Sequence, residues 1–168
     1  MKTGSGEKSM RAAVLGVGNL LMSDEGVGVH AVSALVERYD FPDEVEIIDG
    51  GTSGMELLPE LEGLDHLIVV DAVRAGKPAG SLVRLAGEDV PVFFKIKFSP
   101  HQVGLSDIFA ALRFKGTSPG EVVIVGVEPE SLDLNMSLSP TVAARLDEVV
   151  EMVVAELARV GISALLKK

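Results

Sequence analysis

"LGVGNLLMSDEGVGVH" (residues 15–30) joins a short apolar run to a segment with helical periodicity. The run starts at Ala12 and ends in two glycines, which is typical of a buried strand that enters a loop. Beyond the loop, apolar residues recur at the spacing of one helix face, at Val32, Leu35, Val36 and Tyr39. A strand, a glycine loop and a helix would suit a bound phosphate, but this loop carries Asp24 and Glu25. The stretch therefore predicts the start of an α/β fold with carboxylates where a nucleotide-binding protein would hold phosphate.

Short aliphatic runs predict the remaining strands. VEIIDGG (45–51), DHLIVVDAV (65–73) and EVVIVGVEP (121–129) have the composition of parallel strands that are buried on both faces. GSLVRLAG (80–87) and VPVFFKIKF (90–98) predict two further strands separated by a turn.

Helical patterns separate and follow these strands. SGMELLPELEG (53–63) predicts a short helix that Pro59 distorts, and a later helix carries Leu105, Ile108, Phe109 and Leu112 on one face. A final continuous helix is expected between Ser139, as its N-cap, and Gly161. The order predicts an α/β fold: a three-layer αβα sandwich with a mostly parallel twisted sheet of about five strands and helices on both faces. Residues 1–10 are expected to be a disordered tail, and residues 11–168 a single α/β domain.

Composition excludes several classes of protein. The 168 residues carry 25 acids and 15 bases, a net charge of -10, which argues against nucleic acid as a partner. No apolar run approaches the roughly 20 residues of a membrane helix, and glycines interrupt the one run that resembles a signal peptide. The absence of cysteine excludes a disulfide framework, a zinc-thiolate site and a cysteine nucleophile. A cytoplasmic protein with no membrane partner is expected.

Three potential metal ligands follow predicted strands. Glu25 lies in the loop after the first strand, Asp71 ends the third, and His101 follows the fifth in a predicted loop. Because the carboxyl ends of parallel strands meet at one edge, we expect these residues in a single crevice. Two carboxylates and an imidazole suit a metal of borderline hardness such as Ni²⁺ or Zn²⁺, with coordination positions left open.

Each of these residues also has a structural interpretation. Glu25 would favour the positive end of the following helix, Asp24 would cap that helix, and Asp71 would bind loop amides. The other histidines are weaker candidates, because His66 precedes its strand and belongs at the opposite edge, and His30 lies on a helix.

Other functions fit less of the sequence. A dinucleotide-binding protein would use Gly16 and Gly18 and place Asp49 on a ribose, but Leu21 replaces the third glycine of the motif. The acids at the helix N-terminus would also repel a pyrophosphate. A serine hydrolase lacks its G-x-S-x-G elbow. A nonenzymatic binding module, such as a metal-dependent maturation chaperone, stays open as an alternative.

An ordered set of motifs resembles one known family. GVGN and DEGVG are followed by DGGTSGMELL, DHLIVVDA, SPHQVGLSD and GVEPESL, from about Arg11 to Gly161. These motifs resemble the hydrogenase maturation endopeptidases, which trim the large subunit of nickel-iron hydrogenases. In that family an acid in the first loop, an aspartate at the end of the third strand and a histidine in the later loop bind metal. The residues that match them here are Glu25, Asp71 and His101.

The resemblance implies a substrate and a role for nickel. The expected partner is the precursor of a nickel-iron hydrogenase large subunit, from which a short C-terminal extension is removed. Nickel already installed in the precursor would be the recognition element, and Zn²⁺ or Cd²⁺ is expected to occupy the same site in vitro. Either the metal or a carboxylate, Asp24 or Asp71, would activate the water that cleaves the peptide bond.

Overall fold

A five-stranded sheet forms the centre of the protein in the computed structural model, which describes residues 8–95 and 100–168. The strand order across the sheet is β3 (Val45–Gly51), β1 (Ala12–Val17), β4 (His66–Ala72), β6 (Glu121–Val127) and β5 (Leu82–Ala86). The first four strands are parallel, and β5 pairs antiparallel with β6. The predicted, mostly parallel sheet is confirmed.

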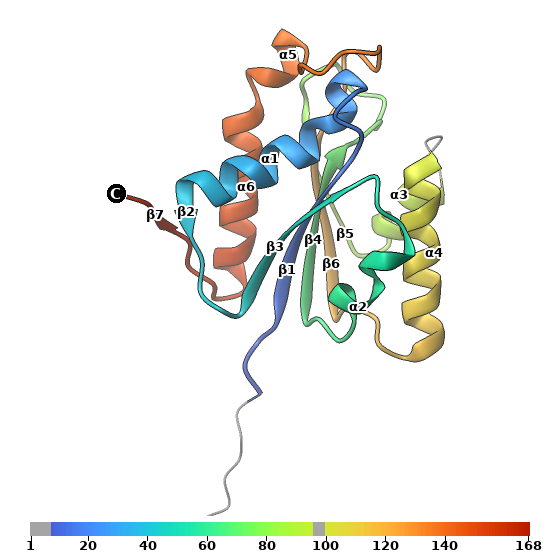
Figure 1. The fold of residues 1–168 in the computed structure, drawn as a ribbon, viewed down its shortest axis with the longest axis vertical. Coiled ribbons are helices and arrows are strands. Elements are labelled where there is room, and N and C mark those ends of the chain that lie inside the picture. The colour runs from blue at the N-terminus through green and yellow to red at the C-terminus, as the bar shows by residue number, and fades with distance from the viewer. Residues whose placement is uncertain (1–7, 96–99) are drawn as a thin grey trace, which may run out of the picture.

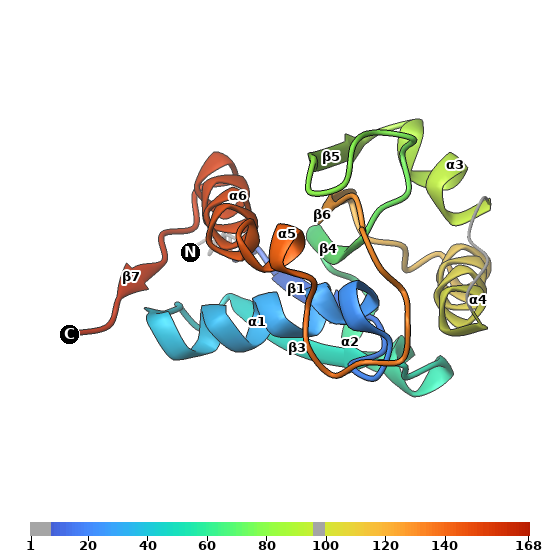
Figure 2. The same cartoon turned by 90° about the horizontal axis from the view of Figure 1, so that it is seen from above.

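Helices cover both faces of the sheet (Figures 1 and 2). One face is covered by α1 (Val27–Arg38) and α6 (Leu146–Arg159), and the other by α2 (Leu58–Leu61), α3 (Asp89–Lys95) and α4 (Pro100–Lys115). Side chains of β1 alternate between the two cores, with Val14 facing α1 and Leu15 facing α4. This burial on both faces explains why β1 reads as a continuous apolar run, and it confirms the three-layer sandwich.

Shorter elements complete the fold. Two short 3-10 helices, η1 (Ser23–Gly26) and η2 (Met55–Leu57), precede α1 and α2, and α5 (Pro140–Ala143) precedes α6. A separate antiparallel pair joins β2 (Tyr39–Asp40) to β7 (Leu165–Leu166). Residues 1–7 of the predicted tail lie outside the described residues, and residues 8–10 are exposed without regular secondary structure. Among the helices of 8–95 and 100–168, none combines the length and the apolar composition needed to cross a membrane.

The strand predicted for residues 90–98 is wrong over residues 90–95, which belong to helix α3, and residues 96–98 lie outside the described residues. The buried residues of α3, Val90 and Phe93, are three positions apart, whereas Val92 between them is 52% exposed. That spacing puts one helix face against the core, whereas a strand would have buried alternate residues. The apolar run is too short for its composition alone to distinguish the repeat of a helix from the two-residue repeat of a strand.

The predicted final helix is broken into α5 and α6. Ser139 caps α5 as expected, since its hydroxyl accepts a hydrogen bond from the Val142 amide. The chain then turns at Ala144 and Arg145, where the Arg145 amide donates to the Val142 carbonyl at 2.9 Å. Apolar side chains are nevertheless buried on both sides of this turn, at Val142 before it and at Val149, Val150, Val153 and Leu157 after it.

Gly28 allows α1 to pack directly on the sheet, and Gly28→Ala is expected to lower the free energy of unfolding by about 1–3 kcal/mol. A Cβ at this position would lie 2.1 Å from the Val70 carbonyl oxygen and 2.5 Å from that of Val17. Both obstacles are backbone atoms, so α1 itself would have to move. Urea unfolding of the variant measures the loss.

Gly104→Ala is the matched control, because Gly104 also lies within a helix. A Cβ there would make an ordinary contact, 3.5 Å from the Gly54 Cα. Alanine is the better helix former by about 1 kcal/mol, so this variant is expected to be as stable as the parent or more stable. Equal stability changes in the two variants would contradict the packing argument.

Candidate functional site

The carboxyl ends of β1, β3, β4 and β6 meet at one edge of the sheet, at the top of Figure 1. The chain passes from β1 to β3 on one side and then returns to β4 on the other side of β1. This reversal creates a crevice between β1 and β4, where open α/β sheets bind ligands. Because η1 follows β1 and contacts β4, it lies at this crevice.

Two of the predicted acids lie at the crevice. Glu25 belongs to η1 and is 8% exposed, and Asp71 is the penultimate residue of β4 and is fully buried. The Asp71 Oδ1 atom accepts a hydrogen bond of 2.8 Å from the amide of Ala72. Part of the predicted structural role of Asp71, binding a main-chain amide, is therefore observed. Such burial places both carboxylates where water screens their charges weakly.

His101 does not lie in the predicted loop, since the backbone is helical from Pro100 onward. Proline is favoured in the first turn of a helix, because its missing N–H would have no partner there, so the helix starts before the histidine. Figure 1 shows that α4 begins at the edge where β1 and β4 end. The side chain of His101 lies outside the described residues, and the described side chains contain no group of three potential metal ligands. The three-ligand site therefore stays a prediction.

Asp24 accepts four hydrogen bonds from a distant loop. Its Oδ1 accepts from the Ser139 amide at 2.7 Å. Its Oδ2 accepts from the Glu130 and Ser131 amides and the Ser139 hydroxyl, each at 2.9 Å. The carboxylate is fully buried. Asp24 therefore fastens the loop of residues 128–139 to the loop that carries Glu25. No side-chain cap bonds are found at the N-termini of η1 and α1, so the predicted capping role is wrong.

Backbone contacts hold the same two loops together. The Ser23 amide donates to the Asn135 carbonyl at 2.7 Å, and the Asn135 amide donates to the Leu21 carbonyl at 2.9 Å. Ser23 itself has a φ of 52°, a conformation that is uncommon outside glycine and is held here by these bonds. Gly18 has a φ of 129°, and a Cβ on it would lie 1.7 Å from the Glu25 carbonyl oxygen. The glycine thus lets the first loop fold back on the segment that carries Glu25.

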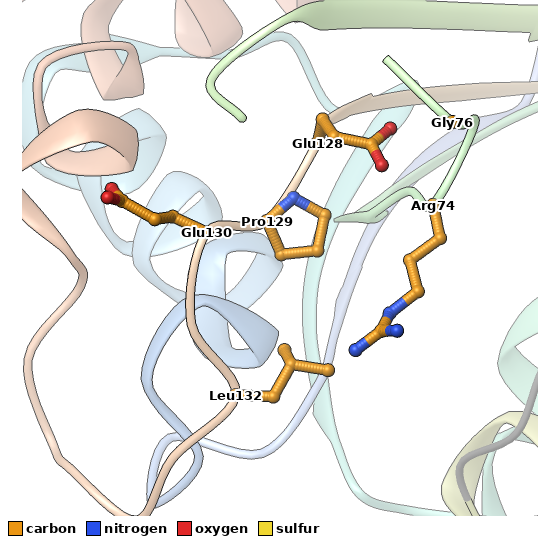
Figure 3. Close-up of a pocket in the computed structure, with 6 residues that line it drawn as sticks. All are labelled: Arg74, Gly76, Glu128, Pro129, Glu130 and Leu132. Carbon is orange, nitrogen blue, oxygen red and sulfur yellow. The ribbon is translucent and has the colours of Figure 1, made fainter. Parts of the chain in front are cut away.

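A pocket of about 380 Å³ opens at this edge (Figure 3). Its walls come from the loops after β4 and β6 and consist of Arg74, Gly76, Glu128, Pro129, Glu130 and Leu132. Glu128 is 8% exposed, and its Oε2 atom accepts a hydrogen bond of 2.7 Å from the Ala75 amide. Arg74, which lines the pocket, is three residues beyond Asp71 in the chain. The pocket therefore lies at the same edge of the sheet as the predicted metal site.

Known proteins share both the sequence and this fold. The model of the hydrogenase maturation protease family matches residues 29–156. The hydrogenase 2 maturation protease of Escherichia coli K12 is 50% identical over 157 residues, which cover 93% of this chain and 96% of that protein. The chain belongs to the hydrogenase maturation protease family.

Solved structures agree with this membership. The hydrogenase maturating endopeptidase HybD from Escherichia coli has a TM-score of 0.90 and 48% identity, covering 94% of this chain and 98% of that one. The nickel-iron hydrogenase maturation protease HybD from Thermococcus kodakarensis has a TM-score of 0.70 and 28% identity, covering 89% and 99%. As a hydrogenase maturation protease, the chain is a peptidase, which decides against the dinucleotide-binding and nonenzymatic alternatives.

Sequence reasoning missed several residues at the edge of this maturation protease. Glu128 directly follows β6 at the carboxyl edge, and sequence reasoning placed it in the predicted strand 121–129 and in the family motif GVEPESL without giving it a role at the site. Its place after a buried strand is the same signal that identified Asp71. No comparable sequence pattern pointed to Arg74 or Ser139. Ser139 binds Asp24, and Arg74 lines a pocket, only after folding has brought distant segments together.

His66 lies at the opposite edge of the maturation protease, as predicted, because it is the first residue of β4. Its ring is 1% exposed and lies between two acids, with Nδ1 3.4 Å from Glu121 and Nε2 3.5 Å from Glu156. Neither ring nitrogen has a hydrogen-bond partner among the described residues. Arg84 and Arg159 complete this cluster by pairing with Glu156. His66 is therefore a core residue remote from the candidate site.

Acidification is expected to destabilise the protein through His66. Burial lowers the pKa of this imidazole below its ordinary 6.5, although Glu121 and Glu156 partly oppose that shift. The unfolded chain therefore binds the proton more readily than the folded protein does. The contribution of neutral His66 to the free energy of unfolding is complete above pH 6.5 and is lost as the pH falls through the folded pKa. Urea unfolding at about pH 7.5 and about pH 5.5 measures this loss. The His66→Gln variant should lose less over that interval, and an equal loss would contradict the assignment.

Proposed function

We propose that this peptidase removes a short C-terminal extension from the nickel-loaded precursor of a nickel-iron hydrogenase large subunit. Family membership supports the reaction class, since the relatives are named for hydrogenase maturation. The observation that carries the proposal is the convergence of Glu25, Asp71 and the first turn of α4 on one sheet edge. We place the reaction in the cytoplasm, which is compatible with a chain that has no cysteine.

In this proposal nickel belongs to the substrate. Glu25, Asp71 and His101 would contact the nickel while the precursor's own ligands still hold it. Two carboxylates and one imidazole leave coordination positions open, which such a shared metal requires. Thiolates would hold the metal more firmly, but the chain contains none. Zn²⁺ or Cd²⁺ would bind the same three residues in the isolated protein.

Asp24 and Asp71 would have different roles in the reaction. Asp24 uses both carboxylate oxygens for its four hydrogen bonds, which favours a positioning role for this side chain. Asp71 is the stronger candidate for the base, because it is buried at the crevice itself. It would take a proton from the attacking water as the water oxygen bonds to the scissile carbonyl carbon. The same proton would then pass to the leaving nitrogen as the peptide bond breaks.

Exposed apolar side chains beside the crevice favour a protein as the substrate. Leu20 and Leu21 of the first loop are 39% and 51% exposed, and Leu134 and Met136 of the loop 128–139 are 81% and 71% exposed. The two loops are paired through the bridge between Met22 and Asn135, so these side chains flank one bridge. Large apolar residues gathered at a surface mark sites of protein contact. A small-molecule substrate would not need an apolar surface outside the crevice.

The direct test is incubation of the purified protein with nickel-loaded precursor, followed by mass analysis of the precursor's C-terminus. We expect loss of one defined C-terminal peptide from the loaded precursor and none from the nickel-free precursor. Equal cleavage of both forms would overturn nickel recognition but leave the peptidase assignment intact. A loaded precursor that stays uncut would overturn the proposed function.

A further inference from the structure

The loop that follows β4 is fastened to the end of β6 on both sides of Arg74. The Val73 amide donates to the Val127 carbonyl at 3.0 Å, and the Ala75 amide donates to Glu128 at 2.7 Å. Farther along the loop, the Gly80 amide donates to the Glu128 carbonyl at 2.9 Å. The backbone of Arg74 is therefore held in place while its exposed side chain lines the pocket.

The guanidinium of Arg74 has no hydrogen bond or ion pair with any residue in the described part of the chain. This contrasts with the arginines that pair with a carboxylate, namely Arg38, Arg84, Arg145 and Arg159. Two glutamates line the same pocket, yet Figure 3 shows the guanidinium extending toward Leu132, away from the carboxylates of Glu128 and Glu130. The guanidinium therefore lies on the Leu132 side of the pocket, whereas the two carboxylates point to other sides.

We propose that this pocket is a subsite for the C-terminal extension of the substrate, in which Arg74 binds a carboxylate of the extension. The inference rests on the proposed function. Arg74 would recognise the extension, which is the part of the substrate that is cut away. A guanidinium offers two parallel N–H donors to a carboxylate, and this geometry fits better than that of a lysine. The chain has a net charge of -10, so a local cation such as Arg74 would favour the binding of a carboxylate.

The other walls of the pocket give the subsite a direction. Glu128 and Glu130 repel a carboxylate on their sides of the pocket, so a carboxylate would bind beside the guanidinium of Arg74. Pro129 and Leu132 supply an apolar wall for the neighbouring residues of the extension. The carboxylate has two possible sources, the free α-carboxylate that ends the extension or an aspartate or glutamate side chain within it.

Arg74→Gln tests the subsite. We expect KM for the nickel-loaded precursor to rise roughly tenfold with little change in kcat, because the contact is remote from the scissile bond and binds substrate and transition state alike. Arg74→Lys should recover part of the affinity, since it keeps the charge but loses the paired donors. Arg113→Gln is the matched control. Arg113 is also exposed and has no ion pair among the described residues, but it lies in the last turn of α4, at the opposite edge.

Altered precursors identify the carboxylate. In one arm the C-terminus of the extension is amidated, and in the other each acidic side chain of the extension is replaced by its amide. One of these changes should raise KM for the parent enzyme about as much as Arg74→Gln does, and should have no further effect on the variant. Additive effects in every arm, or an unchanged KM for Arg74→Gln, would overturn the subsite. Cleavage of the loaded precursor by the parent enzyme keeps that outcome distinct from failure of the proposed function.

Discussion

Replacing Asp71 or His101 with alanine is expected to slow cleavage of the nickel-loaded precursor by at least about a hundredfold. Each change removes one of three proposed contacts to the nickel, and loss of that contact would leave the scissile bond poorly positioned. Asp71 would in addition lose the carboxylate that we propose as the base. The measurement is the initial rate of peptide release by mass spectrometry, with a thermal melt of each variant.

The controls separate loss of the site from loss of the fold. Asp71→Asn keeps the volume of the buried side chain and should be as slow as Asp71→Ala. His66→Ala, at the opposite edge, should cleave normally as long as it is assayed well below its melting temperature. The mechanism would be wrong if His101→Ala cleaved at the parent rate, or if nickel-free precursor were cut as fast as the loaded form.

Asp24→Ala is expected to lower the free energy of unfolding by roughly 3–5 kcal/mol, because buried donors without an acceptor cost about 1–3 kcal/mol each. The amides of Glu130, Ser131 and Ser139 would all lose their acceptor. The loop 128–139 should then separate from the first loop and become sensitive to proteolysis. Urea unfolding gives the stability, and limited proteolysis with mass analysis locates the cut.

Two further variants distinguish positioning by Asp24 from catalysis. Asp24→Asn retains one acceptor oxygen, so its loss of stability should fall between those of the parent and the alanine variant. Asp133→Ala is the matched control, because Asp133 lies in the same loop but is exposed, and its side chain has no bond among the described residues. An Asp24→Asn variant that is as stable as the parent but inactive would contradict the positioning role and favour a catalytic one.

The strands and the position of the acids could be predicted because both depend on local sequence. β1, β3, β4 and β6 are short aliphatic runs, and burial on both faces requires that composition. Once these strands are parallel, Asp71 and the loop that carries Glu25 must lie at one edge. The family motifs then led to the same residues, and the similarity to known maturation proteases confirmed the function class.

The errors occurred where short patterns are ambiguous. The run from Val90 to Phe94 suits a strand by composition and a helix by spacing, and only the position of the core selects the helix. The break between α5 and α6 likewise leaves the apolar face unchanged, so the periodicity does not reveal it. His101 was assigned to a loop although Ser99 and Pro100 repeat the serine-proline pattern that marked the start of the final helix at Ser139, so this signal was present in the sequence and was not used.

The sequence alone determined the layers of this protein and the edge at which its acids lie, since local periodicity and the direction of parallel strands require no distant partner. The tertiary structure decided what each acid does there. Asp24 and Glu25 are adjacent in the chain, yet Asp24 binds amides 106 to 115 residues away. It thereby joins the first loop to the loop 128–139. Arg74 has no ion pair among the described residues, although two glutamates line the same pocket. Such roles depend on distances between remote segments, which only the packing of the whole chain sets.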